Sequence, residues 1–172
     1  MIVKNVSRIK ELGKMKESEN LKFQSYLKLR SFENLNLLIQ SVYHQISSEI
    51  DCKICANCCK ELLVTLDEED IKNFSYGIGI SEDEFKKRFL VKGIGKEYTF
   101  NRLPCPFLRD NLCQYYSYRP KLCRSFPHLG EEDFIFKLKS VLNCTVCPIL
   151  YNFFEVMKFL TGFYEEQTIG RR

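Results

Sequence analysis

A run of closely spaced cysteines, CKICANCC over residues 52–59, constrains this chain more than any other feature. Its gaps of two residues allow the backbone to fold around one centre with three thiolates pointing inward, as in metal knuckles and iron–sulfur loops. A second Cys-x-x-Cys pair lies directly before Pro148. The nine candidate metal ligands are Cys52, Cys55, Cys58, Cys59, Cys105, Cys113, Cys123, Cys144 and Cys147. Burial as a small hydrophobe explains one or two of these cysteines but not their spacing, so the sequence predicts metal binding.

Disulfide bonding is the main alternative for so many cysteines. Residues 1–10 lack the apolar segment of a secretory signal, and no stretch approaches the length of a transmembrane helix, so we expect a cytoplasmic protein without a membrane span. Thiols stay reduced in the cytosol. The odd number of cysteines and the adjacent pair Cys58-Cys59 also disfavour ordinary disulfides, so clustered thiols indicate metal ligands.

The charge of the chain is concentrated near its N-terminus. The formal net charge is +4, and residues 1–30 carry eight Lys or Arg against three Glu. A basic arm of this kind could bind nucleic acid or an acidic partner. Because the stretch has mixed charge, the solvated face of a helix is the better interpretation, and we expect a protein partner rather than nucleic acid.

Helical periodicity dominates the sequence outside the cysteine run. We expect one long helix, or two in succession, over residues 16–50. Asp67 and Ser81 each precede a helical pattern as N-caps, the second over residues 81–90. A further helix with an apolar face opens at residues 144–148.

Short β segments complete the expected fold. The apolar run 62–66 and the alternation over 134–138 each predict a strand, and Asp110-Asn111 predicts the turn of a hairpin with a cysteine on each arm. The sequence thus predicts a mainly α fold with a small β hairpin (α+β), an irregular single domain organised by metal. Its expected parts are an N-terminal helical arm packed on the domain (1–50), a cysteine-cluster metal-binding domain (51–148) and a C-terminal amphipathic helix (149–172).

Five segments carry a family resemblance in their order and spacing: CKICANCC at 52–59, LDEEDI at 66–71, CPFL at 105–108, CQYY at 113–116 and RPKLCRSFP at 119–127. Together they resemble the YkgJ-like cysteine-cluster proteins, which are described as a zinc- or iron-chelating domain. The resemblance implies chelation by the cysteines. The cysteine motif is also similar to that of the larger flagellin lysine methylases, which are understood to hold an iron–sulfur cluster. Methyltransferase activity is not expected, because the Gly-x-Gly segments at 77–79 and 93–95 predict turns rather than a cofactor loop.

Two kinds of metal centre are compatible with the spacing. Iron–sulfur loops often combine three close thiolates with a distant Cys-Pro, which here would join Cys52, Cys55 and Cys58 to Cys147. Zinc sites more often pair two distant knuckles, which would join Cys55 and Cys58 to Cys144 and Cys147. The remaining cysteines could complete the first site or form a second one. The pattern and the resemblance favour an iron–sulfur cluster, with zinc as the alternative.

Two arginines lie beside the cysteines in the sequence. The guanidinium groups of Arg119 and Arg124 could hydrogen-bond to thiolate sulfurs, or they could form ordinary salt bridges with Glu69 or Asp70. His128 is interpreted as a surface or capping residue rather than a ligand, because nine thiols are available.

Three classes of function follow from these observations. The first is a metal-binding module, structural or electron-carrying, that works with a partner protein. The second is an enzyme, or an accessory to an enzyme, in protein modification. The third is a zinc module that binds nucleic acid through the basic arm. Spacing reveals no Ser-His-Asp, Cys-His or paired-carboxylate constellation, so hydrolysis is not expected.

Overall fold

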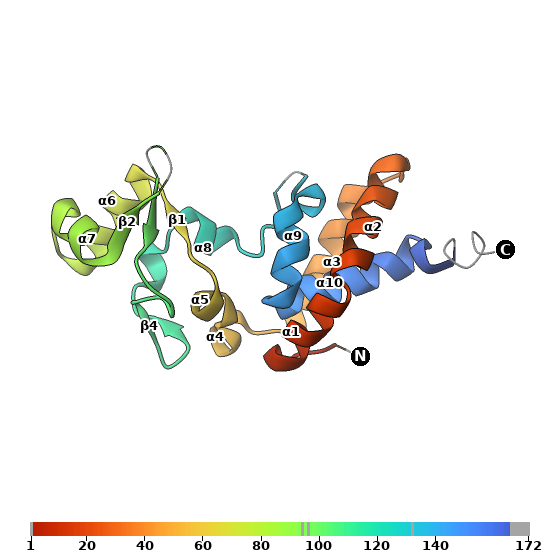
Figure 1. The fold of residues 1–172 in the computed structure, drawn as a ribbon, viewed down its shortest axis with the longest axis horizontal. Coiled ribbons are helices and arrows are strands. Elements are labelled where there is room, and N and C mark those ends of the chain that lie inside the picture. The colour runs from red at the N-terminus through yellow and green to blue at the C-terminus, as the bar shows by residue number, and fades with distance from the viewer. Residues whose placement is uncertain (1, 94, 96, 132, 166–172) are drawn as a thin grey trace. The chain divides into compact units, whose positions relative to one another are not determined.

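The computed structural model describes residues 2–93, 95, 97–131 and 133–165. Helices make up most of this structure, and the strands are short and antiparallel (Figure 1), which confirms the predicted fold class. The chain divides into two compact units. We call Met1–Asp51 with Pro127–Arg172 the terminal unit, and Cys52–Phe126 the central unit. The boundary after Phe126 falls inside the segment predicted as one domain, and the N-terminal arm and C-terminal helix belong to the same unit.

The terminal unit is helical. Its elements are α1 (Val6–Met15), α2 (Glu17–Leu29), α3 (Leu35–Glu49), the 3-10 helices η2 (Phe134–Phe136) and η3 (Asn143–Thr145), α9 (Leu138–Leu142) and α10 (Pro148–Leu160). The helix α10 packs against α3, α1 and η3 and buries an apolar face that includes Leu150, Phe153, Phe154 and Met157. Within the described ranges, no single helix is long and apolar enough to cross a membrane. Only α10 and the segment Leu138–Thr145 taken together have the required length and apolar composition, and the two are bent by 116° relative to each other.

Two predictions for the terminal unit need comment. The pattern over residues 16–50 forms two helices, α2 and α3, and α1 precedes them without having been predicted. The strand predicted over 134–138 is wrong, because these residues form η2 and the start of α9. There the carbonyl oxygen of Lys137 accepts hydrogen bonds from the side chains of Gln24 (2.9 Å) and Ser140 (2.8 Å), so this carbonyl group has hydrogen-bond donors without a neighbouring strand.

The central unit combines short helices with two small sheets. Its helices are α4 (Cys52–Cys55), α5 (Asn57–Glu61), α6 (Glu68–Ile78), α7 (Glu82–Phe89), η1 (Tyr116–Tyr118) and α8 (Lys121–Ser125). One sheet has the strand order β1-β3-β2, formed by β1 (Thr65–Leu66), β3 (Tyr98–Phe100) and β2 (Leu90–Lys92). The other is the hairpin of β4 (Leu108–Arg109) and β5 (Leu112–Cys113).

Local signals in the central unit have mixed outcomes. The N-caps are confirmed, since the Asp67 side chain accepts the amide of Asp70 (2.8 Å) and the Ser81 hydroxyl accepts the amide of Glu84 (3.2 Å). The strand predicted at 62–66 is reduced to its last two residues, and β2 and β3 were not predicted.

The first Gly-x-Gly segment, at residues 77–79, was predicted to be a turn, but only part of it is one. Gly77 lies inside α6, where a Cβ atom would fall 2.3 Å from the Tyr118 ring, and only Gly79 ends the helix, with φ of 81°.

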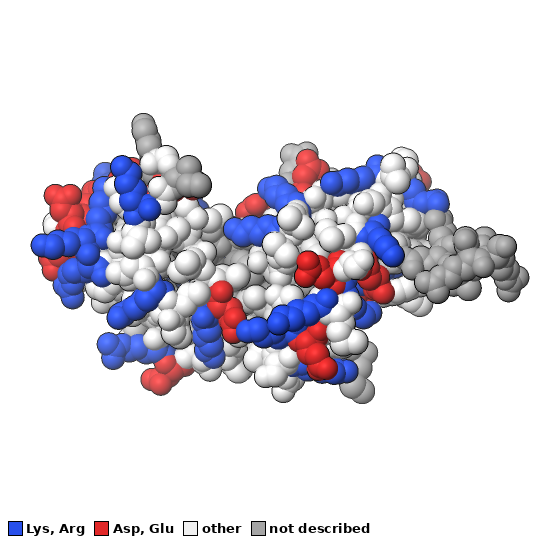
Figure 2. All heavy atoms as spheres, viewed as in Figure 1, with Lys and Arg blue, Asp and Glu red and all other residues white. Residues whose placement is uncertain are grey.

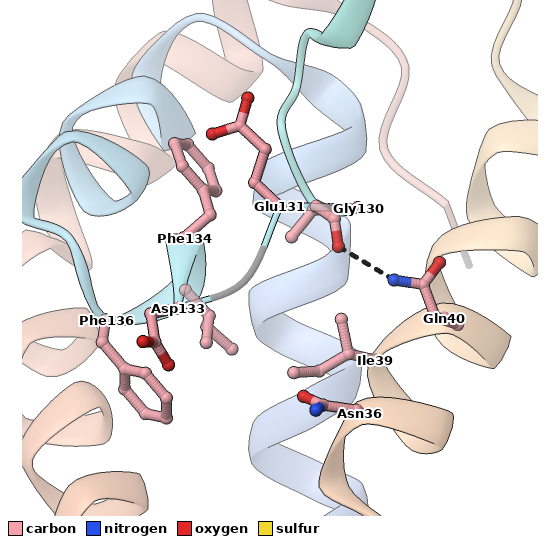
Figure 3. Close-up of a pocket in the computed structure, with 10 residues that line it drawn as sticks. Asn36, Ile39, Gln40, Gly130, Glu131, Asp133, Phe134 and Phe136 are labelled. Atoms are coloured by element: carbon pink, nitrogen blue, oxygen red, sulfur yellow. Dashed lines mark hydrogen bonds between the residues drawn. The ribbon is translucent and has the colours of Figure 1, made fainter.

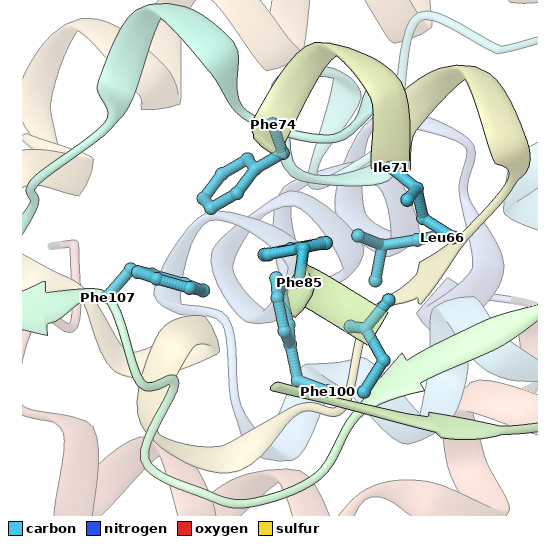
Figure 4. Close-up of a cluster of buried hydrophobic side chains, with 7 residues drawn as sticks. Leu66, Ile71, Phe74, Phe85, Phe100 and Phe107 are labelled. Atoms are coloured by element: carbon cyan, nitrogen blue, oxygen red, sulfur yellow. The ribbon is translucent and has the colours of Figure 1, made fainter. Parts of the chain in front are cut away.

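An aromatic cluster forms the core of the central unit (Figure 4). The Phe74 ring packs against two others, with its centroid 4.8 Å from that of Phe107 and 5.5 Å from that of Phe85. Cys105 and Tyr115 pack against this cluster. One wall of the core therefore faces the region where the cysteines gather.

Candidate metal centre

The cysteine run of residues 52–59 folds as two short helices separated by a sharp turn. The turn is at Ala56, which is buried and has left-handed backbone angles (φ 46°, ψ 16°). This conformation costs a non-glycine residue about 1 kcal/mol, and strain of this kind concentrates at functional sites. The turn lets α5 start anew after α4 and places the Cys58 and Cys59 sulfurs 4.0 Å apart.

The hairpin and the residues just before it carry two further cysteines. Asp110 and Asn111 both have positive φ (48° and 62°), as a two-residue turn of type I′ requires, so the predicted turn is confirmed. Cys113 lies on β5, whereas Cys105 lies just before β4 rather than on it. The amide of Cys105 donates to the carbonyl oxygen of Cys59 at 2.8 Å, and this bond ties the hairpin to the cysteine run.

Helix α8 carries Cys123 and is anchored by a buried carboxylate. Asp70, only 4% exposed, accepts the backbone amide of Lys121 at 2.8 Å, at the first residue of α8. The ammonium group of Lys121 also contacts the carboxylates of Asp67 and Glu69 at 3.2 and 2.6 Å. The segment LDEEDI thus contributes through the position of α8, a role that its sequence alone did not reveal.

Six of the nine cysteines line one cavity of about 230 Å³ in the central unit. They are Cys52, Cys58, Cys59, Cys105, Cys113 and Cys123. Phe74, Phe100 and Phe107 form an apolar wall of the same cavity. Across the part of the chain that the structure describes, no three side chains of Cys, His, Asp or Glu converge closely enough to hold a single metal ion.

The electrostatics of four of these thiols are linked. Burial, together with the negative charges of Cys59 and Cys113, raises the pKa of Cys105 to about 11 and that of Cys123 to about 12. Burial and Cys59 also raise the pKa of Cys113. The four thiols therefore surround one volume in which thiolates repel one another, and a cation among them would remove this repulsion.

Hydrogen bonds and positive charge act in the opposite direction. The backbone amides of Phe107 and Leu108 donate to the sulfur of Cys105, and the amide of Tyr115 donates to that of Cys113, which lowers their pKa values. The bond with Cys58 lowers the pKa of Cys59 to about 7 against the effect of burial, assisted by the charge of Arg119 and Lys60. Amide donors to sulfur are the interactions that stabilise and tune thiolate-bound metals.

The two arginines have different positions. Arg119 lies over the Tyr116 ring, with its Cζ atom 3.5 Å from the ring centroid, and its charge acts on Cys59, Cys113 and Cys123. Arg124 donates to the carbonyl oxygen of Arg119 at 2.8 Å. Neither guanidinium lies within salt-bridge distance of a carboxylate among the described residues, so the alternative of a salt bridge with Glu69 or Asp70 does not hold; Lys121 contacts those residues instead.

The tyrosines near the cysteines do not share one role. Tyr116 lines the cavity, whereas Tyr115 packs into the aromatic core and Tyr118 packs against Tyr76. Of these three tyrosines, only Tyr116 therefore lies beside the cysteines that line the cavity.

Three candidate ligands lie elsewhere. Cys55 is half-buried on α4 and does not line the cavity. Cys144 and Cys147 belong to the terminal unit, where both are buried. The Cys144 thiol donates to the carbonyl oxygen of Ser140 at 3.3 Å, and burial raises its pKa well above the ordinary value. Both ligand sets suggested by spacing combine cysteines of the two units, whereas the cavity gathers a third set within the central unit.

A second cavity, of about 270 Å³, lies within the terminal unit (Figure 3). No cysteine lines it, and the Gln40 side chain donates to the Leu129 carbonyl oxygen there at 3.2 Å. His128 was predicted to be a surface or capping residue, and its burial rules out the surface position. Its Nδ1 atom lies 2.7 Å from the carboxylate of Glu131, a residue of this cavity. The cavity in the central unit is therefore the candidate thiolate site.

Comparison with known proteins identifies the family of this chain. No solved structure matches the chain. A family model, CxxCxxCC, described as "Putative zinc- or iron-chelating domain", matches residues 51–148, more than half of the chain. The match contains all nine cysteines and the cavity described above. The protein is accordingly a member of the CxxCxxCC family of zinc- or iron-chelating domains.

Proposed function

We propose that the central unit binds an iron–sulfur cluster through Cys59, Cys105, Cys113 and Cys123, and that the protein carries electrons for a partner protein. The observation that carries this proposal is the gathering of six cysteines around one cavity. The charge of Cys59 raises the pKa of three others, Cys105, Cys113 and Cys123. Four thiolates are the usual ligand set of such clusters. The nine cysteines form no disulfide in the described structure, which also suits a reducing compartment such as the cytoplasm.

The spacing of the thiols favours a cluster over a single ion. Four sulfurs around one tetrahedral zinc lie about 3.8 Å apart, because each Zn–S bond is about 2.3 Å. The described side chains contain no convergent set of three such ligands. Thiols distributed around a cavity of about 230 Å³ are better suited to a group of several atoms.

Residues around the thiols would support such a group. Phe74 and Phe107 exclude water from one wall, and Arg119 offsets the negative charge of the thiolates. The amides that donate to Cys105 and Cys113 stabilise the ionised sulfurs. When bound, an iron–sulfur cluster supplies one-electron transfer.

Zinc is the second candidate. The 4.0 Å separation of the Cys58 and Cys59 sulfurs is close to the distance expected for two thiolates on one zinc ion. A zinc site built on this pair would be structural and would stabilise the fold of the central unit.

Metal and acid-labile sulfide content of protein purified without oxygen distinguishes the two candidates. We expect iron and sulfide in similar amounts, together with a broad visible absorption that bleaches on reduction. Stoichiometric zinc without sulfide would overturn the cluster and support the second candidate.

Single serine substitutions test the ligand set. Cys113→Ser and Cys123→Ser are expected to lose iron and sulfide, whereas Cys144→Ser retains them, because a hydroxyl can still donate to the Ser140 carbonyl oxygen in the terminal unit. Circular dichroism verifies that each variant is folded. A folded Cys123→Ser protein with unchanged iron, or loss of iron from folded Cys144→Ser protein, would show that the proposed ligands are wrong.

A further inference from the structure

Charge is distributed unevenly within the central unit. The segments that carry its cysteines, 52–61 and 101–126, contain seven basic and only two acidic residues. The basic residues are Lys53, Lys60, Arg102, Arg109, Arg119, Lys121 and Arg124, and the acidic residues are Glu61 and Asp110. The intervening segment 62–100 has more acidic than basic residues. Figure 2 shows Lys and Arg side chains, together with some Asp and Glu side chains, over the part of this unit where Figure 1 places α4 and β4.

Several of these cations are not neutralised by a carboxylate within the described structure. Lys121 pairs with Asp67 and Glu69, but Lys60, Arg109 and Arg119 have no carboxylate within salt-bridge distance among the described residues. The surplus in the two segments is five positive charges, and a cluster held by four thiolates would contribute about −2. The thiolates of the proposed centre therefore account for only part of the positive charge.

The rim of the cysteine cavity combines these cations with exposed apolar groups. Leu112 and Tyr116 line the cavity yet remain 48% and 43% exposed. Lys53 and Arg119 both lie over the Tyr116 ring, at 5.3 and 3.5 Å from its centroid. Arg109 is paired with Leu112 across the hairpin, so both side chains lie on one face. Arg and aromatic residues around an apolar centre are typical of protein interfaces.

We propose that this rim, defined by Lys53, Arg109, Leu112, Tyr116 and Arg119, docks an acidic electron-transfer protein. The partner would present clustered Asp and Glu side chains to the cations and a small apolar contact to Leu112 and Tyr116. The identity of the partner as an electron carrier rests on the proposed function, whereas its acidic character rests on the charges of the rim. Complexes of this kind have small interfaces and depend on electrostatic steering.

Binding of an acidic plant-type ferredoxin to the iron-loaded protein is the test. Calorimetric titrations are made between about 10 mM and 150 mM ionic strength, over which the Debye length falls from about 30 Å to about 8 Å. We expect binding that weakens as salt rises. The double variant Lys53→Glu/Arg109→Glu is expected to weaken binding by about tenfold or more at low salt.

A matched variant controls for the other basic region of the chain. Lys14→Glu/Lys22→Glu makes the same change of charge at exposed positions of α1 and α2 in the terminal unit and is expected to leave ferredoxin binding unchanged. Absence of binding at low salt, or equal loss in both double variants, would overturn the docking proposal.

Two further measurements separate the possible failures. Iron and sulfide are measured in every variant, so that loss of the proposed cluster is distinguished from loss of docking with the cluster intact. A single-stranded oligonucleotide serves as a second polyanion. If it binds more tightly than ferredoxin and Lys53→Glu/Arg109→Glu abolishes that binding, the rim is a nucleic-acid site and the proposed acidic protein partner is wrong.

Discussion

Removal of the Asp70 carboxylate is expected to loosen the helix that carries Cys123. Asp70 lies on α6 and is only 4% exposed, and it accepts the Lys121 amide at 2.8 Å at the first residue of α8. In Asp70→Ala this amide loses its acceptor in a partly buried position. Cys123 follows two residues later, so the position of one candidate ligand depends on the bond.

The magnitude follows from the kind of bond that is lost. A hydrogen bond to a charged group contributes about 1.5–3 kcal/mol, and an unsatisfied buried donor has a similar cost. We therefore expect Asp70→Ala to reduce the free energy of unfolding of the central unit by about 2 kcal/mol, which raises its unfolded fraction about 30-fold. Asp70→Asn keeps a carbonyl acceptor and is expected to lose less.

Urea unfolding followed by circular dichroism measures the change, and hydrogen exchange of residues 116–126 localises it. Glu69→Ala is the matched control, because it removes only the exposed ion pair with the Lys121 side chain, which solvent screens. We expect little change in its midpoint. Equal destabilisation by Asp70→Ala and Glu69→Ala, or unchanged exchange of residues 116–126 in Asp70→Ala, would refute the anchoring role of the buried carboxylate.

Two further predictions concern charge around the thiols. In protein that binds the proposed cluster, Arg119→Gln removes a positive charge that favours the reduced state, so the reduction potential is expected to fall by on the order of tens of millivolts in a potentiometric titration. Arg119→Lys keeps the charge and is expected to restore most of the potential. An equal fall of the potential in the exposed Arg102→Gln variant would contradict this local effect. In reduced, chelator-treated protein, the free energy of unfolding is expected to fall as pH rises from about 9 to about 11. In the folded state buried Cys105 has a pKa of about 11, whereas in the unfolded chain the thiol loses its proton near the ordinary value of 9.0. The contribution of this thiol to the free energy of unfolding is therefore fully present below about pH 9 and is lost as the pH rises towards about 11. Denaturant titrations across this range measure the change, and stability that is constant or increases with pH would contradict it.

Signals that act within a few residues predicted local structure well. The caps at Asp67 and Ser81 and the turn at Asp110-Asn111 each depend on hydrogen bonds or backbone angles among neighbouring residues, and the structure has all three. Signals that depend on distant partners were weaker. The strands β2 and β3 are three residues each and exist through pairing with each other and with β1, so their own sequences carry little pattern.

The residue types and spacing of the cysteines determined by themselves that the chain belongs to a zinc- or iron-chelating family, and helical periodicity determined its mainly helical fold, because both signals are properties of the local sequence. Only the tertiary structure decided which cysteines share a cavity. Spacing suggested that Cys147 completes a set with the first run, whereas folding placed Cys144 and Cys147 in the terminal unit and brought Cys105, Cys113 and Cys123 to Cys59. The physical reason is that these three cysteines reach the cavity through long-range contacts. The backbone hydrogen bond between Cys105 and Cys59 and the Asp70 anchor of α8 each join residues that are distant in the sequence and that come together as the central unit packs around its aromatic core.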